Sequence, residues 1–139
     1  MSEETGADPA VLARVAEEFA DRLDMLQDSD QVTMLARRLT ELSLADLATA
    51  LGLTFTEDDS AQFVTHLAIA LTRINRGEVP IEPSLVAEEE IAERTREREA
   101  VTRVMGDCGR LLDRDVPESE ISYMVVHLCG IVDVQSPSA

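Results

Sequence analysis

Residues 117–130, "PESEISYMVVHLCG", form the longest apolar stretch of the chain and contain one of its two histidines. Apolar side chains recur here at helical spacing, which is typical of one face of an α-helix: Ile121, Val125, Leu128 and Val132. Pro117 suits the first turn of such a helix, and Glu120 places a negative charge where the helix dipole favours it. The stretch therefore predicts a helix with His127 at the border of its apolar face.

Apolar residues recur at helical spacing along nearly the whole chain. The only run in which apolar residues alternate as in a strand is "VPIEP" at 79–83, and its two prolines argue against a strand. Ser43 and Asp46 resemble a capping box, and Gly77 is a natural helix end. The expected helical segments are 8–27, 32–42, 43–52, 56–76, 84–114 with a bend near Gly106 or Gly109, and one that begins at 117. The sequence therefore predicts an all-α bundle.

Composition narrows the possible functions. The chain has 139 residues, 45% of them hydrophobic and 3% aromatic, which suits one domain with an aliphatic core. Its 28 acidic and 12 basic residues give a net charge of -16, which repels phosphate backbones and anionic membranes. There is no signal-peptide pattern, and Cys108 and Cys129 lack metal-ligand spacing. We expect a cytoplasmic protein without cofactor or metal that binds neither nucleic acid nor membrane.

The second histidine, His66, lies in "QFVTHLAIALTRINRGE", residues 62–78, on the flank of an apolar helical face. Asp59 and Arg73, seven residues before and after it, fall on the same stripe. A histidine in such a position is more often structural than functional. Neither histidine helix carries the pair of ligands four residues apart that a specific metal site would need, so a metal site has weak support.

The last helix places a carboxylate and a phenol near its own histidine. Glu120 precedes His127 by two helical turns and falls on its stripe, and Tyr123 lies between them. Either side chain is a candidate to orient the ring of His127. Both histidines therefore border an apolar face, each with a carboxylate on its stripe.

These two stretches resemble the phosphotransferase-system regulation domain (PRD) of bacterial sugar-operon antiterminators and activators. "HLAIALTRINRG", residues 66–77, resembles the first family motif, and "VPESEISYMVVHL", residues 116–128, resembles the second. The positions that match are His66, Arg73 and Gly77 in the first motif, and Pro117, Glu120, Tyr123, His127 and Leu128 in the second. The resemblance covers about residues 30–135, with 1–29 as an N-terminal helical extension and 136–139 as a disordered tail.

The resemblance implies a compact bundle of about five helices, here with an extra N-terminal helix, that forms a homodimer. We also expect that the chain is not an enzyme. It implies that His66 and His127 accept phosphoryl groups from the phosphocarrier HPr or from an enzyme II component, with Arg73 and Glu120 as supporting residues. Thr65 stands where the family often has an acid, for which Asp59 is a remote substitute. Family members usually carry two such domains behind an effector, so this single domain is expected to act through a partner, such as a co-encoded regulator.

Three alternatives remain. The strongest is a dimeric accessory or binding subunit that works without phosphorylation, for a co-encoded protein or a transcription regulator. "SLADLATALGLT", residues 43–54, resembles the start of a helix-turn-helix, but the helix after it is acidic and unsuited to DNA. An enzyme that uses a His–Glu pair for acid/base catalysis is the third, and no nucleophile, glycine-rich loop or metal motif supports it.

Overall fold

The computed structural model describes residues 8–135, so the tail at 136–139 and residues 1–7 lie outside the described part of the chain. Within residues 8–135 every regular element is an α-helix, which confirms the predicted fold class. The described residues form seven helices, whereas the sequence predicts about six. They are α1 (Pro9–Glu18), α2 (Ala20–Asp28), α3 (Met34–Leu51), α4 (Glu57–Asn75), α5 (Leu85–Glu90), α6 (Thr95–Leu112) and α7 (Glu118–Gln135).

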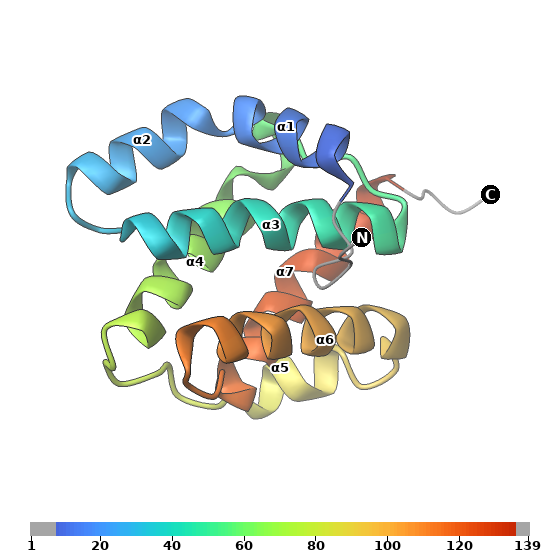
Figure 1. Cartoon of the computed structure of the whole chain (residues 1–139). Coiled ribbons are helices and arrows are strands. Elements are labelled where there is room, and N and C mark those ends of the chain that lie inside the picture. Colours follow the sequence, from blue (N-terminus) through green and yellow to red (C-terminus); the bar gives the residue numbers. More distant parts are fainter. Residues whose placement is uncertain (1–7, 136–139) are drawn as a thin grey trace.

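Helix α3 is the centre of the front layer (Figure 1). It packs between the pair α1–α2 on one side and α6 on the other, while α4 and α7 pass behind it. Helix α7 also packs against α4, α5 and α6, and this brings the two histidine helices together. The largest fully buried side chains come from all of these layers: Phe19, Leu23, Leu44, Leu47, Phe55, Leu67, Leu71, Ile91, Met105, Met124 and Leu128.

The N-terminal segment is bent rather than straight. A single helix over 8–27 is wrong, because the chain leaves helical geometry at Phe19, with φ of -107° and ψ of 15°, and begins α2 at the next residue. The bend lets Val15, Phe19 and Leu23 all reach the core, and each of them is 0% exposed. Asp8 caps α1, as Pro9 after it suggests, because its side chain accepts the N–H of Ala10.

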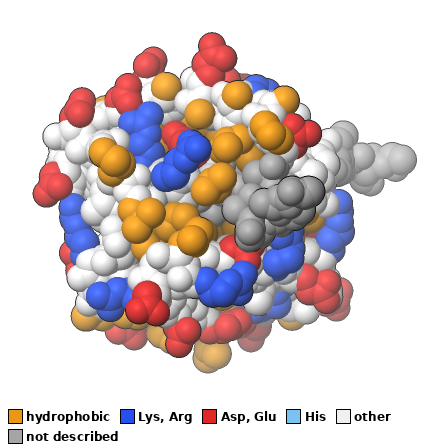
Figure 2. Space-filling model, in the orientation of Figure 1, with side chains coloured by type: hydrophobic (Ala, Val, Ile, Leu, Met, Phe, Trp, Pro, Cys, Tyr) orange, Lys and Arg blue, Asp and Glu red, His pale blue; other side chains and the backbone are white. Residues whose placement is uncertain are grey.

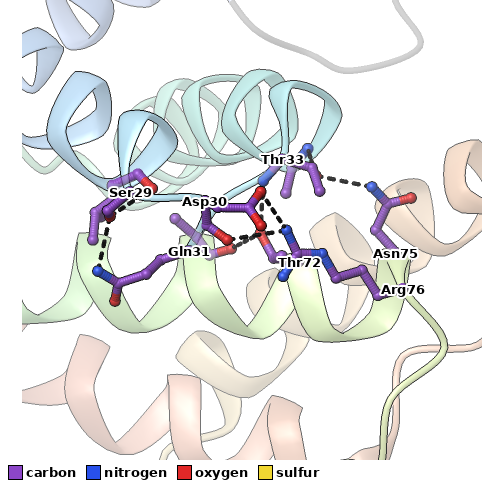
Figure 3. Close-up of polar contacts among 10 residues, drawn as sticks. Ser29, Asp30, Gln31, Thr33, Thr72, Asn75 and Arg76 are labelled. Carbon is purple, nitrogen blue, oxygen red and sulfur yellow. Dashed lines mark hydrogen bonds and ion pairs between the residues drawn. The ribbon is translucent and has the colours of Figure 1, made fainter.

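The turn between α2 and α3 is fixed to the C-terminal end of α4 (Figure 3). Arg76 donates to the backbone oxygen and to the carboxylate of Asp30, and Asn75 donates to the hydroxyl of Thr33. The N–H of Thr33 in turn donates to the hydroxyl of Thr72. These contacts hold the N-terminal helices against the helix that carries His66.

The predicted break at Ser43 is wrong, since α3 runs without interruption from Met34 to Leu51. Ser43 is buried, and its Oγ lies 3.2 Å from Sγ of Cys108 in α6. Asp46, also buried, accepts two hydrogen bonds from Arg103 of α6. The two side chains that resemble a capping box therefore connect neighbouring helices, a role that local sequence does not distinguish from a cap.

The stretch 84–114 breaks in a different place from the one predicted. Helix α5 ends at Glu90 and α6 begins at Thr95, and Ile91 in the connection is buried in the core. Gly106 and Gly109 lie inside α6, which continues through both. A Cβ at Gly109 would lie 2.6 Å from the carbonyl oxygen of Arg114, so this glycine permits close packing of the loop after α6 rather than a bend.

Candidate functional site

Helices α4 and α7 bring three polar rings together. His66 comes from α4, while Tyr123 and His127 come from α7. The ring centroids of the two histidines are 5.4 Å apart, and Tyr123 stands edge-on at 4.9 Å from His66 and 5.3 Å from His127. Tyr123 is 40% exposed, whereas the histidines are partly buried. The cluster of these three rings therefore opens to the protein surface.

A fully buried carboxylate lies beside this cluster. Glu120 is 0% exposed, and its Oε1 lies 3.9 Å from Nε2 of His66. Its Oε2 accepts hydrogen bonds from Nη2 of Arg73, at 3.1 Å, and from the backbone N–H of Ile81, at 3.3 Å. Sequence spacing places Glu120 on the stripe of His127, but in the fold its carboxylate faces His66 across the interface between α4 and α7.

The hydrogen bonding of this site is incomplete. In residues 8–135, the buried side-chain atoms without a hydrogen-bond partner are Nε2 of His66, Nε of Arg73 and Oε1 of Glu120. Buried polar atoms in folded proteins are nearly always paired, so three orphan atoms at one place require an explanation. Such groups cost stability, and a functional role of the site is one explanation for them.

Both histidine rings are held in the neutral form. Burial lowers the pKa of His66 to about 4; His127 and Arg73 contribute to this, and the Glu120 carboxylate opposes it. Burial also lowers the pKa of His127. Near pH 7 each ring therefore has one nitrogen with a free lone pair, the form of imidazole that acts as a nucleophile.

A family model described as the PRD domain matches residues 43–130. The chain belongs to the PRD family. The match covers most of the chain and includes both histidines, Arg73, Glu120 and Tyr123, so the resemblance of the two motifs is confirmed. It identifies the chain in general terms as a regulatory module related to the phosphotransferase system. No curated protein and no solved structure matches the chain significantly.

Helices α1 and α2 precede the part of this PRD domain that the family model matches. Arg22 of α2 donates to the hydroxyl of Thr65, next to His66, and pairs with the carboxylate of Glu57. Sequence reasoning missed Arg22 and also Ile81, because neither residue lies on a histidine helix. No periodicity signal identifies them, since both reach the site through contacts between segments.

Asp59, expected as a remote supporting residue, lies apart from the ring cluster. Its carboxylate accepts hydrogen bonds from Thr56, Ser60 and Gln135 at the start of α4. These contacts join the first turn of α4, whose N-cap is Thr56, to the end of α7. The other site residues predicted from the sequence, His66, Arg73, Glu120, Tyr123 and His127, are brought together by the fold.

Three further findings concern metal ligands, thiols and membrane spans in the described part of this PRD domain. Residues 8–135 contain no group of three or more His, Cys, Asp or Glu side chains that could hold a metal ion. Burial raises the pKa of the Cys108 and Cys129 thiols to about 11, so neither is a ready thiolate. No helix in this region is both long and apolar enough for a membrane span.

Proposed function

We propose that this PRD domain is a regulatory switch that HPr or an enzyme II component of the sugar phosphotransferase system phosphorylates at His66, at His127 or at both. One arrangement supports the proposal above all: two neutral histidine rings meet at the surface, next to the Arg73–Glu120 pair. The spacing of the two motifs agrees with this reading. By the same reading the domain is a cytoplasmic homodimer that acts through a partner, such as a co-encoded regulator, and has no catalytic activity of its own.

The transfer needs little from this chain beyond a neutral ring in the right place. The lone pair of an imidazole nitrogen attacks the phosphorus of the phosphorylated donor, and a new N–P bond forms on this chain. The bond between the phosphorus and the donor breaks, and the donor keeps its electron pair. The carboxylate of Glu120 faces Nε2 of His66 and favours a proton on that nitrogen, which defines the tautomer.

The new group then needs a positive partner. A phosphoryl group brings roughly two negative charges to a chain whose net charge is already -16. Arg73 pairs with Glu120, which faces His66, and the buried Nε of Arg73 has no hydrogen-bond partner. A charge-assisted hydrogen bond from its guanidinium would stabilise the phosphorylated state.

Intact-mass spectrometry tests the proposal directly. The protein is incubated with phosphorylated HPr and, separately, with a phosphorylated enzyme II component, and we expect a gain of one or two phosphoryl groups. His66→Asn and His127→Asn each remove one acceptor, and the double variant removes both, because the chain has only two histidines. Asp59→Asn, away from the cluster, is the matched control and should be phosphorylated like the parent. Failure of every donor, or a mass gain that persists in the double variant, would refute the proposal.

One observation favours a second function, the accessory or binding subunit that works without phosphorylation. A small pocket of about 20 Å³ between α3 and α6 is lined by the apolar side chains of Leu39, Leu42, Val104 and Leu111, and also by Ser43, Asp46, Asp107 and Cys108. Leu111 is 59% exposed. The face over these helices carries hydrophobic side chains near its centre, among scattered charged ones (Figure 2). This function predicts a stable complex with a co-encoded protein whose affinity is the same with and without the phosphoryl donor.

A further inference from the structure

The linker between α4 and α5, residues 78–84, is held to α7 at one position. It contains no helix or strand and includes Pro80 and Pro83, which have no N–H to donate. Ile81 is the attachment point: its N–H donates to Oε2 of Glu120 at 3.3 Å, and its carbonyl oxygen accepts from the hydroxyl of Ser119 at 2.9 Å. The side chain of a fully buried residue therefore holds the middle of the linker.

The same carboxylate belongs to the histidine site. The oxygen of Glu120 that accepts from Ile81 also accepts from Arg73, and the other oxygen faces Nε2 of His66. A buried carboxylate is tolerated when a cation and hydrogen bonds compensate for its lost hydration. Any event that draws Arg73 away from Glu120 therefore acts on the hydrogen bond that holds the linker.

The linker also has room to move. A cavity of about 410 Å³ lies beside it, lined by Glu78 and Pro80 of the linker, by Arg73, Ile74 and Gly77 before it, and by residues 113–115 and Pro117. Three large apolar side chains in or just after the linker face solvent: Val79 at 81% exposed, Leu85 at 83% and Val86 at 73%. A displacement of the linker would therefore rearrange exposed apolar surface without disturbing the packed core.

We propose that Glu120 couples the charge at His66 to the position of the 78–84 linker, and this inference rests on the proposed phosphorylation of His66. A phosphoryl group on the ring attracts Arg73 and repels the Glu120 carboxylate. Without its cation the buried carboxylate turns away, and the N–H of Ile81 loses its acceptor. The linker, then held to α7 only by the bond from Ser119 to the carbonyl oxygen of Ile81, shifts and moves Val79, Leu85 and Val86. A partner protein binds the altered surface.

Hydrogen exchange measured by mass spectrometry on the full chain follows the linker in each state. On phosphorylation, we expect the amide of Ile81 to exchange roughly tenfold faster, as for the loss of one hydrogen bond. Amides of α3 and α6 should keep their rates. If the chain is phosphorylated at His66 and the rate at Ile81 does not change, the coupling is overturned while the proposed function stands.

A second experiment tests the coupling without any phosphoryl donor. Arg73→Gln removes the cation, so linker exchange should rise as it does on phosphorylation, whereas Arg73→Lys should restore protection. Adding Glu120→Gln to Arg73→Gln should also restore it, because a neutral amide needs no cation and its oxygen still accepts from Ile81. Arg103→Gln, which removes the cation from buried Asp46, is the matched control and should leave the linker unchanged.

The outcomes separate the coupling from the proposed function. If no donor phosphorylates the chain, the proposed function fails, and the Arg73 and Arg103 variants still decide whether Glu120 controls the linker. If Arg103→Gln raises linker exchange as much as Arg73→Gln does, general loosening explains the effect and the coupling is wrong. The coupling is also wrong if the double variant Arg73→Gln/Glu120→Gln exchanges as fast in the linker as Arg73→Gln alone.

Discussion

Two buried ion pairs hold helices of this PRD domain together, and they differ in how completely they are bonded. Between α3 and α6, both oxygens of Asp46 accept from Arg103, each at 3.1 Å. Between α4 and α7, Glu120 receives one hydrogen bond from Arg73 and leaves Oε1 without a partner, facing His66. The first pair is fully satisfied, which is typical of a structural contact; the second keeps bonding capacity beside two histidines.

The two ion pairs also differ in how far their side chains are exposed to solvent. Asp46 is 5% exposed and its partner Arg103 has a side chain that is 48% exposed, so that pair lies close to water. Glu120 is 0% exposed and the side chain of Arg73 is 25% exposed. The comparison suggests that the α3–α6 pair mainly stabilises the fold, whereas the α4–α7 pair costs stability that the histidine site requires.

The largest effect on the free energy of unfolding should come from removing the cation of one pair at a time. Arg73→Met leaves the carboxylate of Glu120 buried without compensation and should lower the free energy of unfolding by about 3–5 kcal/mol. Arg103→Met should cost only about 1–2 kcal/mol, because Asp46 lies near solvent and can regain water. Urea unfolding at pH 7 of both variants and the parent provides the measurement. Equal losses would remove the distinction between the two pairs.

A smaller effect is expected on the pH dependence of the free energy of unfolding. The pKa of His66 lies at about 4 in the folded chain, below its ordinary value of 6.5, so the unfolded chain takes up the proton first. The stability that this neutral ring contributes is complete above pH 6.5 and is lost as pH falls towards 4. The total is on the order of 3 kcal/mol, since a shift of one pKa unit corresponds to about 1.4 kcal/mol.

The measurement compares variants across that range. Urea unfolding at pH 7.5 and pH 5 should show a shallower loss for His66→Gln than for the parent. His127→Gln is the control, and its effect on the pH dependence should be smaller, since the burial of His127 depresses its pKa less strongly. Carboxylates with lowered pKa values, such as Glu57 and Glu97, also cost stability in acid but are common to all three proteins. If the free energy of unfolding fell equally with pH in the parent and in His66→Gln, the lowered pKa of His66 would be contradicted.

The smallest effect on the free energy of unfolding should come from the contact between Ser43 and Cys108 at the α3–α6 interface. Ser43→Ala removes the contact between its hydroxyl and Sγ of Cys108 and should cost about 1 kcal/mol or less, because a thiol is a weak hydrogen-bonding partner. Phosphorylation of the histidines should be unaffected, which the mass assay can check on the same sample. If this variant altered phosphorylation, the two interfaces would not be independent.

Local signals in the sequence predicted much of the helical outline. The expected segment 56–76 agrees with α4 at Glu57–Asn75, and Gly77 follows its end with a positive φ of 71°. Predictions failed where a residue with a local helix signal instead serves a contact between helices. Ser43 bonds to another helix instead of capping its own, and burial of Phe19 bends a segment whose period alone indicates one straight helix.

For this protein, the order of residues was sufficient to identify the helical period, the all-α class, the family, and five of the residues that meet at the candidate site. Packing in three dimensions was needed to show that Glu120 faces His66 rather than His127, and that the same carboxylate holds Ile81. This division arises because periodicity assigns residues to the faces of one helix and carries no information on which faces pack together. Long-range packing of α4, α7 and the linker sets those contacts, and with them the charge environment of the histidines.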